Sequence, residues 1–285
     1  MISWPGSLVR EVAQRRCILF LGSGVSATAK TTAGVSPPTW FEFLNQASKL
    51  VADASERNEI VSLINSGDSL LALQAICDVA NPADYQDLLN AVFHSPRYQP
   101  SRLHEAVHRL DSRIVVTTNF DRIYEAYCMQ PEKEGYKVIV YDSTSLADEI
   151  RGDKRLIIKA HGSIDNISKM IFTRAEYHAA KSQHAKFYDI LKALFLTHTC
   201  IFIGCGLADP DIMLLMEDVK ILGTQQRPHY ALVLKGKNSK FKIEEWRQTY
   251  NVVALEYEPD HDALTTDLLQ LSDMVEAHRF STATA

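Results

Sequence analysis

Three side chains in this sequence have the chemistry needed to break a glycosidic bond. The imidazole of His161, which precedes a glycine, can accept a proton near neutral pH and act as a general base. The amide of Asn119 can donate and accept hydrogen bonds, so it can hold a water molecule or a ribose hydroxyl. The carboxylate of Asp121 can stabilise the positive charge that develops when a bond to a cationic base breaks. Asn119, Asp121 and His161 are therefore the candidate catalytic residues.

Two of these side chains also have a structural interpretation, which the sequence leaves open. Asp121 can cap the helix that begins at Arg122. A histidine such as His161 can be packed in the fold without any catalytic role. Their position favours a binding site, because each residue lies within four residues of the end of a predicted strand.

Four predicted buried strands each end in a polar or glycine-rich turn. The turns are 22–26 after the strand at 17–21, 118–121 after 113–117, 161–163 after 156–159, and 204–209 after 200–203. In an open parallel sheet the carboxyl ends of the strands lie along one edge, where ligands bind in a crevice. We therefore expect the four turns to meet in one site, although they are far apart in the sequence.

The first turn matches a phosphate-binding pattern. The spacing Gly22-x-Gly24-x-x-Ala27 permits a tight turn and a close backbone approach, and the helix that follows offers amide donors to a pyrophosphate. An ordinary Rossmann dehydrogenase also carries an acidic residue at the end of its second strand, about 20 residues further on. Here that position is Glu42, in a helical stretch, so the sequence disfavours a hydride-transfer enzyme.

The elements around these turns predict an α/β fold with a mainly parallel, Rossmann-like sheet and helices on both faces. Continuous apolar runs are typical of strands that helices cover on both faces. We expect strands at 17–21, 113–117, 136–141, 156–159, 200–203, 230–234 and 252–257. We expect helices at 40–52, 56–65, 70–79, 85–93, 102–110, 240–250 and 263–277. The sequence thus predicts one domain over residues 1–285, with a large helical insertion at about 40–110 beside the sheet.

The composition argues against several classes of protein. The 285 residues carry a net charge of −5, so we expect no direct nucleic-acid binding. No apolar run approaches the roughly 18 residues of a membrane span, and the first residues show no secretory signal. The five cysteines are scattered and form no Cys-x-x-Cys pair. We therefore expect reduced thiols, a cytoplasmic location, and neither disulfides nor a four-thiolate zinc site.

Taken together, the four turns resemble the sirtuin superfamily in its prokaryotic sirtuin-like branch. The resemblance implies a Rossmann-like NAD⁺ site in which Asn119 and Asp121 lie at the nicotinamide ribose and His161 is the catalytic base. It also implies that the phosphates face Gly22, Ser23, Gly24 and Ser26, and that the adenosine half lies near Gly204, Gly206 and Asp209. Thr118 and Ser163 are further expected cofactor-binding residues. Residues 34–40 occupy the place of the family's mobile cofactor-binding loop.

Departures from the family pattern change the expected activity. Sirtuin deacylases carry a zinc module of two Cys-x-x-Cys pairs, which this chain lacks, and the insertion replaces the region of the acyl-lysine cleft. The resemblance therefore implies an NAD⁺ hydrolase that uses NAD⁺ as substrate, needs no metal, and releases nicotinamide and ADP-ribose. Two alternatives remain, an NAD-dependent protein deacylase and a non-catalytic sensor or scaffold that binds NAD⁺ or ADP-ribose.

The same branch contains effectors of anti-phage systems that deplete NAD⁺. By this resemblance we expect an anti-phage role and a homo-oligomer. A short member of this kind also resembles the partner of a HerA-type hexameric ATPase. These expectations rest on analogy with the family rather than on any residue.

A rival motif is His104-Glu105-x-x-His108, the spacing of a zinc metalloprotease helix. Its apolar face is formed by residues at helical spacing, namely Leu103, Ala106, Val107 and Leu110. This pattern predicts that His104 and His108 lie on the flank of the helix, toward solvent. The setting makes the metalloprotease a remote alternative, and we expect no metal site.

Overall fold

The computed structural model describes residues 1–94, 96–130, 135–207, 210–222 and 227–283. Its centre is a seven-stranded sheet in the order β3-β4-β2-β1-β5-β6-β7, in which every pairing is parallel. The strands are β1 (Cys17–Leu21), β2 (Ile114–Thr117), β3 (Lys137–Val140), β4 (Leu156–Lys159), β5 (Thr199–Ile203), β6 (His229–Leu234) and β7 (Val252–Tyr257). Each lies within two residues of its predicted position, and the Rossmann-like fold class is confirmed.

The register of the central strands aligns the ends that carry the four turns. Leu21, the last residue of β1, pairs with Thr117 of β2 and with Ile203 of β5. Thr117 in turn pairs with Lys159, the last residue of β4. The four turns therefore begin at the same level on the carboxyl edge of the sheet, as parallel strands require.

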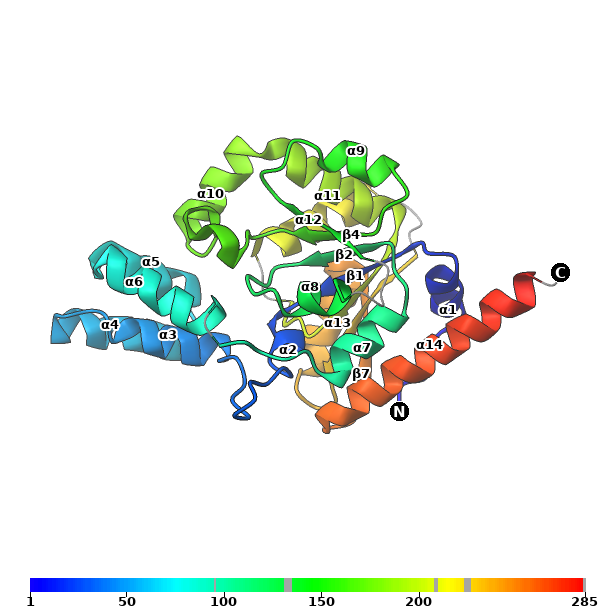
Figure 1. Cartoon of the computed structure of the whole chain (residues 1–285), viewed down its shortest axis with the longest axis horizontal. Coiled ribbons are helices and arrows are strands. Elements are labelled where there is room, and N and C mark those ends of the chain that lie inside the picture. The colour runs from blue at the N-terminus through cyan, green and yellow to red at the C-terminus, as the bar shows by residue number, and fades with distance from the viewer. Residues whose placement is uncertain (95, 131–134, 208–209, 223–226, 284–285) are drawn as a thin grey trace.

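Helices cover both faces of the sheet (Figure 1). One face packs against α9 (Leu146–Arg151), α10 (Arg174–Gln183), α11 (Ala185–Thr197), α12 (Pro210–Leu222) and α13 (Lys240–Tyr250). The other packs against α1 (Gly6–Ala13), α7 (Arg102–Arg109), α8 (Ile123–Cys128) and α14 (His261–Ala283). Strand β1 contributes side chains to the cores on both faces of the sheet. Ile18 and Phe20 pack in the core under α9–α13, and Leu19 and Leu21 pack in the core under α1, α7, α8 and α14.

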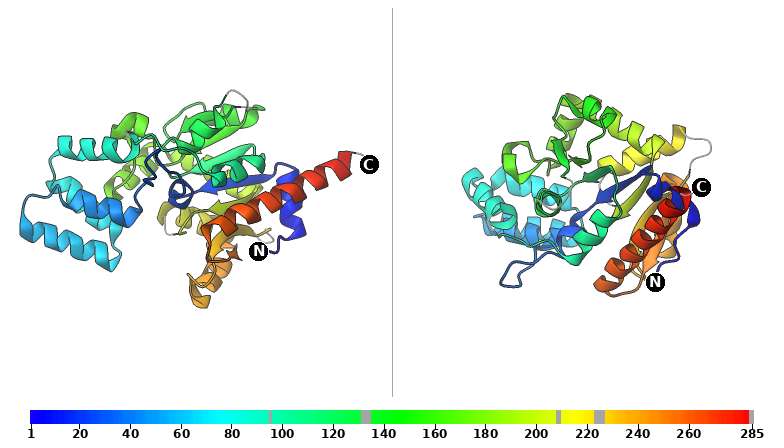
Figure 2. Two further views of the ribbon diagram at one scale, coloured as in Figure 1. Left: turned by 60° about the horizontal axis from the view of Figure 1, so that its bottom comes forward. Right: turned by 45° about the vertical axis from the view of Figure 1, so that its right-hand side comes forward.

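The predicted helical insertion forms a third core beside the sheet. It contains α3 (Trp40–Ser48), α4 (Ala54–Ser66), α5 (Ser69–Val79), α6 (Pro82–Leu89) and the π-helix η1 (Asn90–His94). Side chains of the turns after β2 and β4 complete this core, notably Phe120, Ile164 and Phe172. The insertion therefore packs directly on the edge of the sheet that carries the turns, on the side opposite to the C-terminal end of α14 (Figure 2).

Local sequence signals explain where the insertion begins and turns. Thr39 and Glu42 form a capping box at the start of α3, in which Glu42 N donates to Thr39 Oγ1 and Thr39 N donates to Glu42 Oε2. Asp53 caps α4, which ends at Gly67 in the left-handed region, where glycine has no steric penalty. Helices α1, α9, α10, α11 and α12 lie outside the predicted helical ranges, and α14 extends to residue 283 rather than 277.

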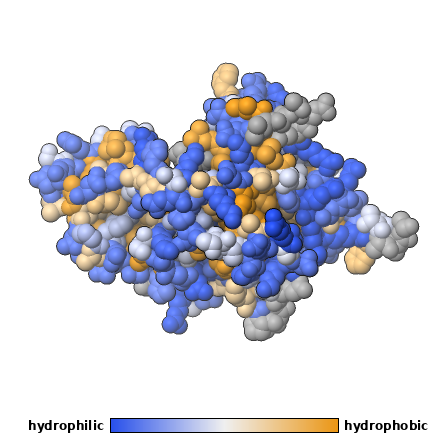
Figure 3. Space-filling model, turned by 90° about the horizontal axis from the view of Figure 1, so that it is seen from above, coloured by the Kyte–Doolittle hydropathy of each residue, from blue (hydrophilic) through white to orange (hydrophobic). Residues whose placement is uncertain are grey.

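Hydrophilic side chains cover most of the face shown in Figure 3, and apolar ones form separate small patches. Among the described residues, no helix is both long enough and apolar enough to cross a membrane.

Candidate active site

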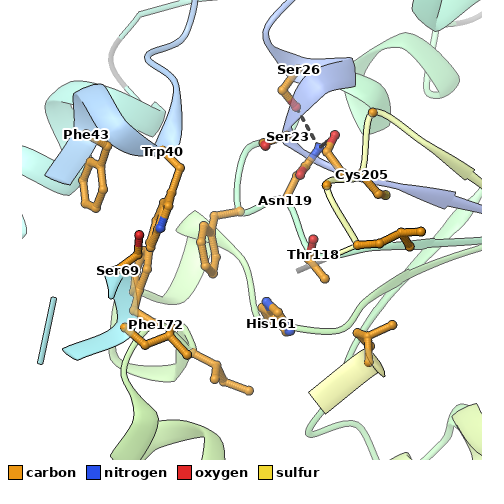
Figure 4. A pocket seen from close by; sticks show the side chains of 18 of the residues that line it. Ser23, Ser26, Trp40, Phe43, Ser69, Thr118, Asn119, His161, Phe172 and Cys205 are labelled. Atoms are coloured by element: carbon orange, nitrogen blue, oxygen red, sulfur yellow. Dashed lines mark hydrogen bonds between the residues drawn. The ribbon is translucent and has the colours of Figure 1, made fainter. Parts of the chain in front are cut away.

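A cavity of about 570 Å³ lies between the carboxyl edge of the sheet and the helical insertion. This volume is in the range of small-molecule sites. Residues of all four turns line it, namely Gly22, Ser23, Ser26, Thr118, Asn119, Asp121, His161, Gly204 and Gly206. Figure 4 shows Asn119, Thr118 and His161 on one side of the pocket and Trp40, Phe43 and Phe172 on the other. The predicted convergence of distant turns is therefore present.

The first and fourth turns are locked together through backbone contacts. The amide of Gly24 donates to the carbonyl of Gly204 at 3.0 Å, and the amide of Gly22 donates to Ile203 O at 3.0 Å. Gly204 has φ +66°, and a Cβ there would lie 2.5 Å from Val25 N, so no other residue fits without a shift. Gly24 does not line the cavity, and its amide donates to Gly204. Because Gly24 has no side chain, the two turns can approach each other this closely.

A hydrogen-bond network joins the first turn to the second. Asn119 Nδ2 donates to the carbonyl of Gly22 and to Ser26 Oγ, each at 2.9 Å. Ser26 Oγ in turn donates to Asp121 Oδ2 at 2.7 Å. Since both amide protons of Asn119 are used, its Oδ1 is the atom left to accept a hydrogen bond from a ligand or water.

Asp121 also has the structural role that the sequence allowed. Its Oδ1 accepts from the amide of Ile123, the first residue of the short helix α8, at 2.9 Å, although the N-cap position itself is Arg122. The carboxylate is thus held by Ser26 on one oxygen and by the α8 backbone on the other. A structural and a chemical role of Asp121 are compatible, because the same residue binds the start of a helix and lines the cavity.

His161 is buried in the wall of the cavity. Its ring lies edge-on to Tyr177 of α10, with centroids 5.1 Å apart and an angle of 85° between the planes. The Tyr177 hydroxyl lies 3.3 Å from Nδ1. The following Gly162 has φ +92°, and a Cβ there would lie 2.5 Å from Lys169 O. This tight turn lets the chain fold back so that Ile171 N donates to His161 O at 2.9 Å.

An aromatic wall faces these polar groups across the cavity. Trp40 stacks on Phe172, with ring centroids 6.1 Å apart and an angle of 8° between the ring planes. The ring centroids of Phe172 and Phe120 are 4.1 Å apart. Phe43 and Phe93 complete the wall. Such a surface is suited to a planar base. No sequence pattern singled out Phe172, Phe93 or Tyr177, because they reach the site through tertiary packing rather than through a strand-end turn.

Like Gly24, Ser163 was predicted to bind the cofactor but does not line the cavity. Ser163 is buried, and its hydroxyl accepts from Asp165 N and donates to Asp165 Oδ2 at the start of the 3₁₀ helix η2 (Ile164–Lys169). Asp209 lies outside the described residues.

The expectation that His104 faces solvent is wrong. His104 is 0% exposed, and its Nδ1 accepts from the Ser101 amide at 3.1 Å in the capping box of α7. Helical side chains point toward the N-terminus, so the ring folds back under the first turn and beside Tyr124 of α8. Burial lowers the pKa of His104 to about 4. Among the described residues, no group of three His, Cys, Asp or Glu side chains is arranged to hold a metal ion.

The fold and the cavity together define a Rossmann-like α/β protein with its candidate site at the carboxyl edge of the sheet. A family model described as the SIR2-like domain matches residues 113–255, which is half of the chain. The chain therefore belongs to the SIR2-like domain family, and the resemblance to sirtuin-like proteins is confirmed. The match includes Asn119, His161 and Gly204, whereas the turn at 22–26 precedes it.

The chain is also similar to named proteins, among them two NAD(+) hydrolases and a defense-associated sirtuin. The NAD(+) hydrolase ThsA of Enterococcus faecium is 26% identical over 228 residues, which cover 76% of this chain and 43% of the relative. The NAD(+) hydrolase ThsA of Acinetobacter baumannii is 23% identical over 84% of this chain and 46% of its own length. Defense-associated sirtuin 2 of Bacillus subtilis is 20% identical over 73% of this chain and 19% of its own length. The matched region thus spans less than half the length of each of these relatives.

Proposed function

We propose that this chain hydrolyses NAD⁺ to nicotinamide and ADP-ribose. The observation that carries the proposal is the cavity shared by the Asn119–Ser26–Asp121 network and His161. The names of the two ThsA relatives, NAD(+) hydrolases, support it. The cavity volume of about 570 Å³ and its aromatic wall suit a ligand that contains planar bases.

The proposed mechanism assigns one step to each polar group. Water attacks the ribose carbon that carries nicotinamide, the carbon–nitrogen bond breaks, and its electron pair leaves with nicotinamide. Asn119 Oδ1 orients the water or a ribose hydroxyl, and His161 takes the proton that the water loses. The carboxylate of Asp121 stabilises the positive charge that builds up on the ribose. The pyrophosphate binds along the first turn, at Gly22 and Ser23, and Gly204 and Gly206 face the adenosine half.

We further propose the biological setting that the family resemblance implies. The chain acts in the cytoplasm as an NAD⁺-depleting effector of anti-phage defence, and it assembles as a homo-oligomer. The name of the Bacillus subtilis relative, a defense-associated sirtuin, supports this setting. A HerA-type ATPase is the proposed partner. Residues 1–285 act as one functional domain, in which the insertion at about 40–110 covers the site.

The activity is tested by incubating the purified protein with NAD⁺ and quantifying nicotinamide and ADP-ribose by chromatography. We expect release by the wild type, and a decrease of at least about 100-fold in Asn119→Ala and in His161→Ala. Equal release by wild type and His161→Ala would refute the role of His161 as the base. Binding of NAD⁺ without turnover would instead favour a sensor, and a requirement for an acetylated peptide would favour a deacylase. The same assay with a HerA-type ATPase added tests the proposed partner.

A further inference from the structure

A fully buried lysine lies directly beneath the candidate site. Lys159 is the last residue of β4, two residues before His161, and its side chain is 0% exposed. Its ammonium group donates to the carbonyl of Phe120 at 3.2 Å, to the carbonyl of Asp121 at 2.6 Å, and to Glu125 Oε1 at 2.5 Å. An ammonium group has three protons, so these three acceptors use all of them.

The ion pair with Glu125 is not the only interaction that a lysine makes at this position. Glu125 is also buried, and burial raises its pKa, although the neighbouring ammonium of Lys159 opposes the rise. Replacing a buried ion pair by apolar residues of similar volume is often neutral or stabilising. What an apolar residue cannot replace is the pair of hydrogen bonds to the backbone at positions 120 and 121.

These two carbonyls belong to the turn that carries Asn119 and Asp121. The segment after β4 also binds this turn through Ala160 N to Thr117 O at 2.8 Å and Ile164 N to Phe120 O at 3.0 Å. The contact from Lys159 reaches further along the turn, to the carbonyl of Asp121. Lys159 thus links the second turn to the end of β4, and His161 lies two residues after this end.

We propose that Lys159 is a positioning residue that sets the second turn, and with it Asn119 and Asp121, relative to His161. The proposal rests on the proposed NAD⁺ hydrolysis for its kinetic consequence. A displacement of about 1 Å of a reacting group can cost about 100-fold in rate. Loss of these hydrogen bonds should therefore lower kcat. KM should change little, because the first turn keeps its backbone contacts with the fourth turn, and Phe43 and Phe172 stay packed in the core of the insertion.

The test removes both charges at once, so that no unpaired buried ion remains. In Lys159→Met/Glu125→Met we expect kcat for NAD⁺ hydrolysis to fall at least about 30-fold, with KM within about threefold of wild type. Hydrogen–deuterium exchange without NAD⁺ should become at least about tenfold faster at the amides of residues 118–123. Lys169→Met is the matched control, because Lys169 pairs with Asp142 at the surface, and both measurements should stay at the wild-type values.

Each other outcome decides against one proposal or the other. A folded double variant with wild-type kcat or with wild-type exchange at 118–123 overturns the positioning role. If the wild type releases no nicotinamide, the proposed hydrolysis fails, and the exchange measurement still decides whether Lys159 holds the turn. If the double variant does not fold, Lys159→Arg replaces it, because it keeps the charge but has a planar donor group. The same fall in kcat and faster exchange are then expected, and unchanged values overturn the proposal.

Discussion

Asn119 Nδ2 and Ser26 Oγ lie 2.9 Å apart, although 93 residues separate them in the sequence. Ser26 stands in the turn after β1 and Asn119 in the turn after β2, and neighbouring parallel strands bring the two turns together. Because Ser26 also donates to Asp121, one hydroxyl orients both candidate catalytic side chains of the second turn.

Removal of the Ser26 hydroxyl should lower turnover more than it lowers stability. In Ser26→Ala, Asn119 loses one of its two acceptors and Asp121 loses a donor, so we expect kcat to fall by about tenfold to 100-fold. The free energy of unfolding should fall by only about 1 to 3 kcal/mol. Nicotinamide release and urea unfolding measure the two effects. Ser66→Ala, at an exposed hydroxyl of α4, is the control that should change neither, and wild-type kcat in Ser26→Ala would contradict the orienting role.

The Gly204 position should tolerate no side chain. Gly204→Ala places a Cβ 2.5 Å from Val25 N in a left-handed backbone, so we expect a loss of at least about 2 kcal/mol of stability. Gly206→Ala is the matched variant, because no atom lies within 4 Å of its added Cβ and its φ is not positive. Its melting temperature should stay close to that of the wild type. Similar melting temperatures for the two variants would refute the locked contact between the first and fourth turns.

The aromatic wall should contribute to both the fold and substrate binding. Phe172→Ala removes a buried ring that contacts Phe120 and Trp40, so we expect a loss of about 3 to 5 kcal/mol. The KM for NAD⁺ should rise, because the far wall of the cavity loses its surface. Phe41→Ala, at a ring of α3 that is 54% exposed, should change stability by less than about 1 kcal/mol. Urea unfolding and steady-state kinetics give both values, and equal losses in the two variants would contradict this account.

Acid should destabilise the fold through His104. Burial lowers its pKa to about 4 in the folded state, whereas the unfolded chain titrates at about 6.5. As the pH falls below about 6.5, His104 binds a proton in the unfolded state but not in the folded state. The free energy of unfolding therefore decreases from about pH 6.5 down to about pH 4. From pH 7 to pH 5 this amounts to about 2 kcal/mol.

The variant His104→Gln isolates this contribution. Glutamine is the ordinary partner in a capping box, so it can still accept from the Ser101 amide without titrating. Urea unfolding at pH 7 and pH 5 should show that the variant loses about 2 kcal/mol less than the wild type between the two values. His229, whose pKa burial also lowers to about 4, remains in both proteins and cancels in the comparison. An identical loss in the two proteins would show that His104 is not buried as a neutral ring.

The sheet and the strand-end turns could be predicted because their signals are local. Each central strand is a short, mostly apolar run with glycine or a polar residue within two positions of its end, and the parallel order brings these ends together. Most of the predicted turn residues accordingly line one cavity. The pattern did not distinguish a glycine that faces a ligand from one that packs against another turn, as Gly24 does against Gly204.

The remaining parts of the site depend on contacts between distant elements. Tyr177 reaches His161 from α10, a helix that the sequence did not predict, and Phe172 meets Trp40 only because the insertion folds onto the sheet edge. Likewise, helical periodicity placed His104 on the flank of its helix. Periodicity does not show that α8 packs against this flank through Tyr124. Lys159 is only the last residue of a predicted strand in the sequence, and its three acceptors become visible in the structure.

The central place of β1 has a consequence for work with shortened chains. The family match begins at residue 113, but β1 lies between β2 and β5 and pairs with both. A fragment of residues 113–255 would lack this strand, leaving the inner sides of β2 and β5 without a partner. Unpaired strand edges of this kind recruit other chains, so such a fragment should aggregate rather than fold. The limits of sequence similarity are therefore not the limits of an independently stable unit in this protein.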